Sequence, residues 1–89
     1  MSANSVVVHS VDTLEEFSAL LSRERDDIET LYDSLVQNCL EQADNWQDPQ
    51  YDVLRENLTS FAQESKSQLA SLDESITYLT RLITKLRDV

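Results

Sequence analysis

The stretch Asp44-Asn45-Trp46-Gln47-Asp48-Pro49-Gln50 is the strongest break in this chain, and it separates two long amphipathic segments. It contains the only tryptophan and the only proline of a chain that has no glycine. Asp48 followed by Pro49 is typical of a helix start, because the aspartate accepts from free amides and proline lacks only an amide that the first turn does not need. The stretch predicts a helical hairpin with Trp46 at its tip.

The segment before the break predicts a helix over residues 12–44. Apolar side chains recur at steps of three and four residues, which is the spacing of one helical stripe. Two pairs fit the capping box that starts such a helix, and both stay open: Asp12 with Glu15, and Thr13 with Glu16. Residues ahead of it, 1–11, are expected to form a flexible or extended arm, because their short β-branched run cannot form a sheet alone.

The segment after the break predicts a second helix over residues 49–87, joined to the first by a turn at 45–48. If the chain folds back at Trp46, facing residues have numbers that sum to the low nineties, and the two apolar stripes then meet along their whole length. We therefore expect an all-α fold, an antiparallel two-helix hairpin. Its predicted core consists of Leu14, Phe17, Leu21, Leu31, Leu35, Leu58, Phe61, Leu72, Ile76 and Leu79.

A second row of apolar residues lies beside the first stripe near the predicted tip of the hairpin. Another such row lies beside the second stripe near the C-terminal end of the second helix. One neighbouring helix cannot cover faces that broad, and antiparallel packing of two hairpins would bring the two rows together in a four-helix bundle. This self-complementarity favours a homodimer over pairing with a related helical-hairpin chain. The predicted dimer or partner interface consists of Tyr32, Val36, Cys39, Ala43, Tyr78, Leu82 and Leu86.

The chain carries a formal net charge of -10 over 89 residues, and most of it lies in the first half. Such an acidic first helix repels phosphates and anionic lipids, so we expect neither nucleic-acid binding nor association with a membrane surface. Two interpretations of these carboxylates stay open. A solvated face is favoured, and a basic partner is the alternative.

No pattern in the sequence predicts catalysis, a cofactor or a metal site, so we expect a non-enzymatic protein. His9 has no second histidine or cysteine near it, and Cys39 is expected to be a small buried apolar residue. The N-terminus lacks the basic start and long apolar core of a signal peptide, and no stretch is long enough to span a bilayer. We expect a chain made in the cytoplasm, and any secretion to proceed without a cleaved signal.

A short acidic chain folding as two helices around a Trp-bearing turn resembles the WXG100 (ESAT-6-like) proteins of bacteria. Trp46-Gln47-Asp48 has aspartate where most of the family has glycine, and it is similar to the divergent branch with a Trp-x-Asp turn. The resemblance implies a dimeric substrate or targeting partner of type VII secretion, which acts with a larger effector or a secretion component. It also implies that Trp46 sits beside the partner and the secretion machinery.

One departure from the family leaves a second function open. Many members carry a Tyr-x-x-x-Asp/Glu export signal near the C-terminus, whereas Tyr78 is followed four places later by Leu82. The alternative is an intracellular helical adaptor or complex subunit that is not exported. Trp46 likewise has two interpretations, as a cap that shields Ala43 and Leu54 from water or as a contact for another protein.

Overall fold

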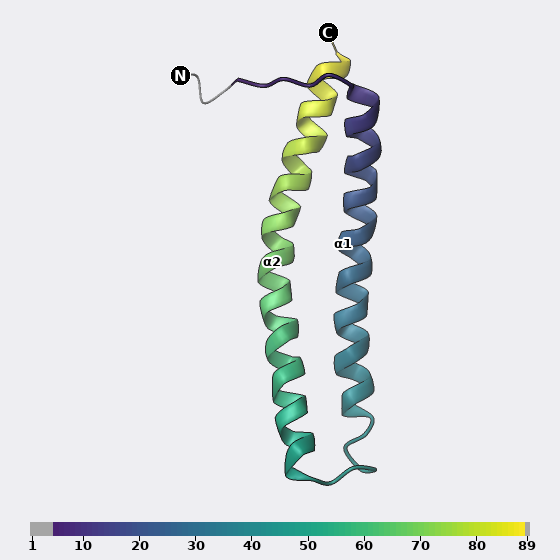
Figure 1. Cartoon of the computed structure of the whole chain (residues 1–89), viewed down its shortest axis with the longest axis vertical. Coiled ribbons are helices and arrows are strands. Elements are labelled where there is room, and N and C mark those ends of the chain that lie inside the picture. The colour runs from purple at the N-terminus through teal and green to yellow at the C-terminus, as the bar shows by residue number, and fades with distance from the viewer. Residues whose placement is uncertain (1–4, 89) are drawn as a thin grey trace.

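The computed structural model of the chain describes residues 5–88, and within this range it contains two helices and no strand. Helix α1 spans Val11–Leu40 and helix α2 spans Pro49–Arg87, and the two run antiparallel, side by side (Figure 1). The chain, with its N-terminal arm, extends over 61 × 27 × 15 Å along its principal axes. The predicted all-α hairpin is confirmed. Residues 1–4 of the expected arm and Val89 lie outside the described residues.

Helix α1 begins one residue earlier than expected because its cap is Ser10. The Ser10 hydroxyl oxygen accepts a hydrogen bond from the Thr13 amide at 3.2 Å and donates one to the Thr13 hydroxyl at 2.9 Å. Neither of the two expected caps, Asp12 and Thr13, serves as the cap, because both already lie inside the first turn. Asp12 pairs instead with Arg87 of α2.

Helix α1 ends at Leu40, four residues before the expected end at Asp44. The backbone then tightens into turns in which the amides of Gln42 and Ala43 donate to carbonyls only three residues back. The connection to α2 therefore comprises residues 41–48, rather than a turn at 45–48 alone.

The register of the hairpin differs from the expected one. The two interhelical ion pairs, Arg25 with Asp73 and Asp12 with Arg87, join residues whose numbers sum to 98 and 99 rather than to the low nineties. The reason is visible at the tip, where α2 extends well past the end of α1 and the connection spans the difference (Figure 1). Ile83 is consequently buried and lines one groove together with Ser18.

The row of α1 that faces α2 is also one position away from the expected stripe. Ser18, Arg25, Tyr32 and Cys39 recur every seven residues, and Ser18 and Cys39 are the buried residues of α1. Ser18 in this row and Ser65 on α2 are small enough to be buried, whereas the bulkier side chains one position away, Phe17 and Leu31, are exposed.

Because α1 turns a different row of residues toward α2, part of the predicted core is wrong. Six of the predicted residues are half-buried between the helices, namely Leu14, Leu21, Leu58, Leu72, Ile76 and Leu79. The other four are exposed: Phe17 by 50%, Leu31 by 59%, Leu35 by 41% and Phe61 by 54%. The buried apolar residues of the described chain are instead Cys39, Tyr51, Leu69 and Ile83.

Candidate interaction surface

One side of the hairpin is an apolar face, which we define by the exposed side chains of Phe17, Ile28, Leu31, Leu35, Leu54 and Phe61. Helical spacing places these residues on the same side of the molecule. Phe17 precedes Leu31 by fourteen residues, and Phe61 precedes Gln68 by seven, so each pair shares one row of its helix. Leu31 and Gln68 line the same depression between the helices. The apolar face therefore extends over both helices.

That depression is a hollow of about 460 Å³ at the middle of the apolar face. Ile28, Leu31 and Leu35 contribute its α1 wall, while Ser65 and Gln68 lie on the α2 side. The small side chain of Ser65 stands where a leucine would otherwise fill the space between the helices. The lining is mainly apolar, which suits an aromatic or aliphatic side chain from another helix.

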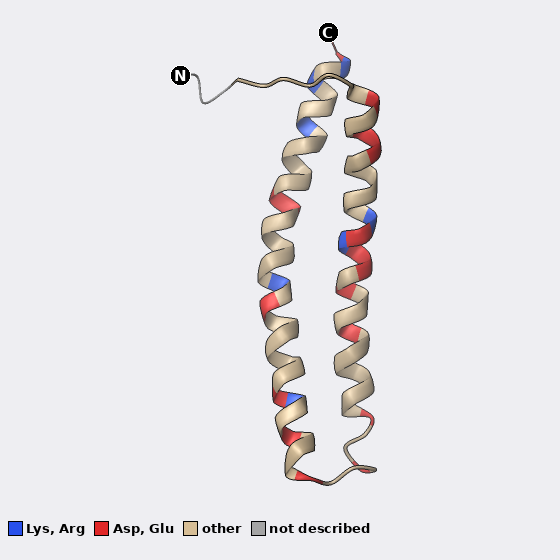
Figure 2. Ribbon diagram, viewed as in Figure 1, with Lys and Arg blue, Asp and Glu red and all other residues tan. Residues whose placement is uncertain are grey.

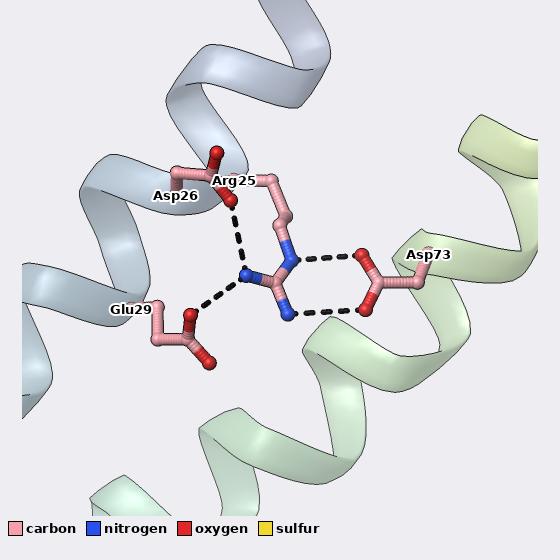
Figure 3. Close-up of polar contacts among 4 residues, drawn as sticks. All are labelled: Arg25, Asp26, Glu29 and Asp73. Atoms are coloured by element: carbon pink, nitrogen blue, oxygen red, sulfur yellow. Dashed lines mark hydrogen bonds and ion pairs between the residues drawn. The ribbon is translucent and has the colours of Figure 1, made fainter.

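An ion-pair network centred on Arg25 lies between the two helices. Its guanidinium donates two hydrogen bonds to Asp73, Nε to Oδ1 at 2.7 Å and Nη2 to Oδ2 at 3.0 Å (Figure 3). Nη1 donates to Glu29 at 2.8 Å and to Asp26 at 3.1 Å. The carboxylates of Asp73 and then Glu29 raise the pKa of Arg25 above its usual value, because both favour the charged guanidinium.

A second set of ion pairs closes the far end of the hairpin. The acidic start of α1 lies alongside the basic end of α2 (Figure 2). Arg87 Nη2 donates to Asp12 at 2.6 Å and to Glu15 at 3.0 Å. These bonds, that to Asp12 first, raise the pKa of Arg87. The carboxylates of Asp12 and Glu15 are thus paired with arginine at this end of the hairpin.

Tyr51 anchors the tip of the hairpin. Its hydroxyl donates a 2.7 Å hydrogen bond to the backbone carbonyl of Cys39, which also accepts from the Gln42 amide at 3.0 Å just past the end of α1. The Arg55 guanidinium lies 5.9 Å from the centre of the Tyr51 ring. Tyr51 is buried, and this burial is the main cause that raises the pKa of its hydroxyl. Tyr51 thus ties the first turn of α2 to the end of α1.

Trp46 lies against this anchor and remains 38% exposed. Its ring meets that of Tyr51 edge to face, with centroids 5.5 Å apart, and its Nε1 donates to Asp48 at 3.4 Å. Asp48 also caps α2, accepting from the backbone amide two residues later at 2.8 Å, and Pro49 opens that helix. The expected shielding of Ala43 and Leu54 does not occur, because both stay exposed while Trp46 packs on Tyr51.

The residues of the predicted partner interface lie in different environments. Cys39 is buried, Tyr32 and Val36 are half-buried, and Tyr32 lines the hollow. These three are consequently engaged within the hairpin. The remaining four were expected at the same surface: Ala43 and Tyr78 are exposed, whereas Leu82 and Leu86 are half-buried.

Several contributors to the surface were missed from the sequence. Arg25, Asp73 and Tyr51 were not among the residues expected at the core or at the partner interface. The available signal was the seven-residue spacing of Ser18, Arg25 and Tyr32, which places an arginine in the row of α1 that faces α2. Phe17 and Leu31 lie one position before Ser18 and Tyr32, and their bulk made the wrong row more conspicuous.

Residues 5–88 lack the features of two other kinds of site. No group of three or more His, Cys, Asp or Glu side chains there could hold a metal ion. Neither described helix combines the length and the apolar character needed to cross a membrane.

Comparison with known proteins gives no relative. No protein-family model matches the chain, and no characterised protein or solved structure matches it at a significant level. The interpretation of its function therefore depends on the geometry of the chain and on the resemblance of its Trp-bearing turn to the turn of WXG100 proteins.

Proposed function

We propose that this chain is a small non-enzymatic, WXG100-like protein that acts through protein–protein interaction, pairing its hairpin with another to form a four-helix bundle. In this role it is a substrate or targeting partner of type VII secretion. Its partner is a second copy or a related helical-hairpin chain, and the pair engages a larger effector or a secretion component.

The observation that carries this proposal is the apolar face. Four apolar residues are buried in the described part of the hairpin, whereas Phe17, Leu31 and Phe61 are each at least half exposed. A chain of 89 residues that leaves so much apolar surface in water gains stability by covering it. Helices from a second hairpin match such a long, straight surface, because they add a parallel or antiparallel layer along its whole length.

The secretion role is supported by the tip. Trp46 is half exposed at the end of the hairpin, held by Tyr51 and Asp48, so its ring is fixed in orientation and available to another protein. Aromatic residues that need no ordering on binding make effective interface anchors. This arrangement suits the contact role that the family resemblance implies for Trp46.

Export is tested in the native host by following the chain in cells and in culture supernatant, with the secretion ATPase intact and with it inactivated. We expect the chain in the supernatant of the intact strain alone, with a cytoplasmic protein as the lysis control. Equal amounts in both supernatants, or retention in cells of both strains, would contradict the secretion role.

An intracellular adaptor is the second candidate, and the position four residues after Tyr78 favours it. Leu82 stands where an acidic residue would complete the export signal, and it is half-buried in α2. Leu82→Glu is the discriminating variant, with Arg81→Glu as a control for added charge. If the chain is an adaptor, neither variant is exported, and the chain co-purifies from cell extracts with a stable protein partner.

A further inference from the structure

The tip of the hairpin contains a recess beside its two aromatic rings. This tip recess has a volume of about 370 Å³, and its lining includes Trp46, Asp48, Tyr51, Asp52 and Arg55. The rings of Trp46 and Tyr51 meet edge to face there, with centroids 5.5 Å apart. The face of an aromatic ring attracts positive charge, so a recess walled by two rings and two carboxylates favours a cation.

One cation already lies at the tip recess, and it belongs to the chain itself. The central carbon of the Arg55 guanidinium lies 5.9 Å from the centre of the Tyr51 ring, within the range of a cation–π contact. The same guanidinium pairs with Asp52, Nη2 to Oδ1, at 3.8 Å. Arg55 therefore shows that a guanidinium fits against Tyr51 and which groups it meets there.

The contacts that keep Arg55 in this place are weak. Its ion pair with Asp52 is long and joins two residues three positions apart on the same helix, and the Arg55 side chain remains 46% exposed. Within residues 5–88 no ion pair or hydrogen bond of Arg55 reaches α1. Arg55 can therefore turn into water without opening the hairpin, and a second guanidinium can take its place against Tyr51.

The charge of the tip favours such a ligand. Residues 41–56 contain five carboxylates, and Arg55 is the only basic residue among them (Figure 2). One guanidinium leaves most of this negative charge uncompensated. A positively charged group on another protein is therefore attracted to the tip, most strongly at low ionic strength.

We propose that the tip recess binds an arginine side chain of a partner protein, which displaces Arg55 and lies against Tyr51 beside Trp46. Arginine suits the recess better than lysine, because a planar guanidinium stacks on an aromatic ring while it donates to carboxylates. This inference rests on the proposed function for the role of Trp46 as a contact, and it gives that contact a chemistry. The partner is basic at the point where it meets the tip.

A peptide titration tests the nature of the ligand. The probes are three capped pentapeptides, Ac-Gly-Ser-X-Ser-Gly-NH2, with arginine, citrulline or lysine at X. Citrulline keeps the shape of arginine without its charge, and lysine keeps the charge without the planar group. Binding to the isotope-labelled full-length chain is followed by NMR at low salt. The chain has a single tryptophan, so one indole N–H signal reports on the tip recess.

We expect the arginine peptide to shift the indole signal of Trp46 and the amide signals of the first turns of α2. It should bind at least about threefold more tightly than the lysine peptide, and the citrulline peptide should not bind measurably. Equal affinity for the arginine and lysine peptides would overturn the assignment to arginine. No binding, or shifts spread along the acidic residues of α1, would overturn the site.

A second pair of variants tests the displacement of Arg55. Arg55→Ala empties the recess, whereas Arg23→Ala removes the same charge from an exposed position on α1. We expect Arg55→Ala to tighten binding of the arginine peptide at least about fivefold and Arg23→Ala less than about twofold, because only Arg55 competes for the recess. Equal effects would show that Arg55 is not displaced. Arg55→Gln, which keeps most of the side chain, replaces the alanine variant if circular dichroism shows a loss of helix.

The carboxylate of Asp52 is tested in the same titration. Asp52→Asn removes a partner of the bound guanidinium, and Asp33→Asn removes the same charge from an exposed position on α1. We expect Asp52→Asn to weaken binding of the arginine peptide at least about threefold, and Asp33→Asn less than half as much. Equal weakening by both variants would reduce the attraction to net charge alone and overturn the site.

These outcomes are distinguishable from those that decide the proposed function. If the arginine peptide does not bind, the tip recess loses its ligand, while ATPase-dependent export is still decided by the supernatant assay. If the peptide binds at the recess and the chain is not exported, the site stands and the secretion role fails.

Discussion

The guanidinium of Arg25 in α1 and the carboxylate of Asp73 in α2 meet through two parallel hydrogen bonds across the hairpin. Such two-point pairing fixes the distance and angle between the groups as well as their charge complementarity. Sliding one helix by a single turn would move Asp73 about 5 Å away from Arg25. The pair therefore selects the observed register over the one that the apolar stripes alone would allow.

Replacing Arg25 by lysine tests whether geometry or charge matters in this pair. Lysine keeps the charge but cannot form the two-point contact, so we expect Arg25→Lys to lower the melting temperature nearly as much as Arg25→Ala, by roughly 5 °C. Asp73→Asn provides the second arm of a double-mutant cycle in thermal melts. Strictly additive effects of Arg25→Ala and Asp73→Asn would show that the pair contributes no coupling.

Stability should fall at alkaline pH through Tyr51. Burial raises its folded-state pKa above the unfolded value of about 10. The neutral hydroxyl therefore stabilises the fold fully below pH 10, and this contribution is lost as pH rises through the higher folded pKa. We expect the melting temperature of wild type to drop between pH 10 and 11 more than that of Tyr51→Phe. Parallel curves for the two proteins would contradict this assignment.

Trp46→Ala separates packing from contact at the tip. Because the Trp46 ring is half exposed and touches Tyr51 by its edge, we expect the melting temperature to fall by only about 3 °C. Partner binding or export, measured at matched abundance, should fall much further. Trp46→Phe is the control that retains an aromatic edge against Tyr51. A large loss of stability, with function following abundance, would leave Trp46 a structural role alone.

Ser10→Ala should destabilise α1 by about 1 kcal/mol, since it removes the side-chain acceptor for the Thr13 amide. Asp12→Ala, by contrast, removes only one partner of an exposed ion pair and should destabilise the fold less than Ser10→Ala does. Urea titrations of the two variants distinguish these contributions. A larger loss for Asp12→Ala would reassign the helix cap to Asp12.

Much of the fold could be predicted from the sequence because local signals agreed: the three-and-four spacing of the stripes and the Asp48-Pro49 start. The register and rotation could not, because leucines and phenylalanines one position away form an equally regular stripe. What decides between the rows is the fit of small residues such as Ser18 and Ser65, together with the Arg25 pairing. Both depend on contacts between distant parts of the chain, which spacing along one helix does not encode.

The same limit applies to the interaction surface. Apolar residues in excess of one interface were evident from the sequence, but which of them face outward depends on the rotation of α1. Phe17 and Phe61 were placed inside the hairpin for that reason, and Cys39 was placed outside it. The Tyr51 anchor combines a side chain of α2 with a backbone carbonyl of α1. Every residue has such a carbonyl, so the sequence does not show which one will accept the hydrogen bond.

Among the described residues, none has a positive φ, and the eight-residue connection at 41–48 reaches α2 through ordinary backbone conformations. Aspartate at position 48, extended at φ -154°, needs no glycine to make the bend. Nearly any amino acid could be substituted along this connection without backbone strain. The backbone therefore does not restrict which amino acids the turn contains. Substitutions there should be harmful only where they remove a side-chain contact.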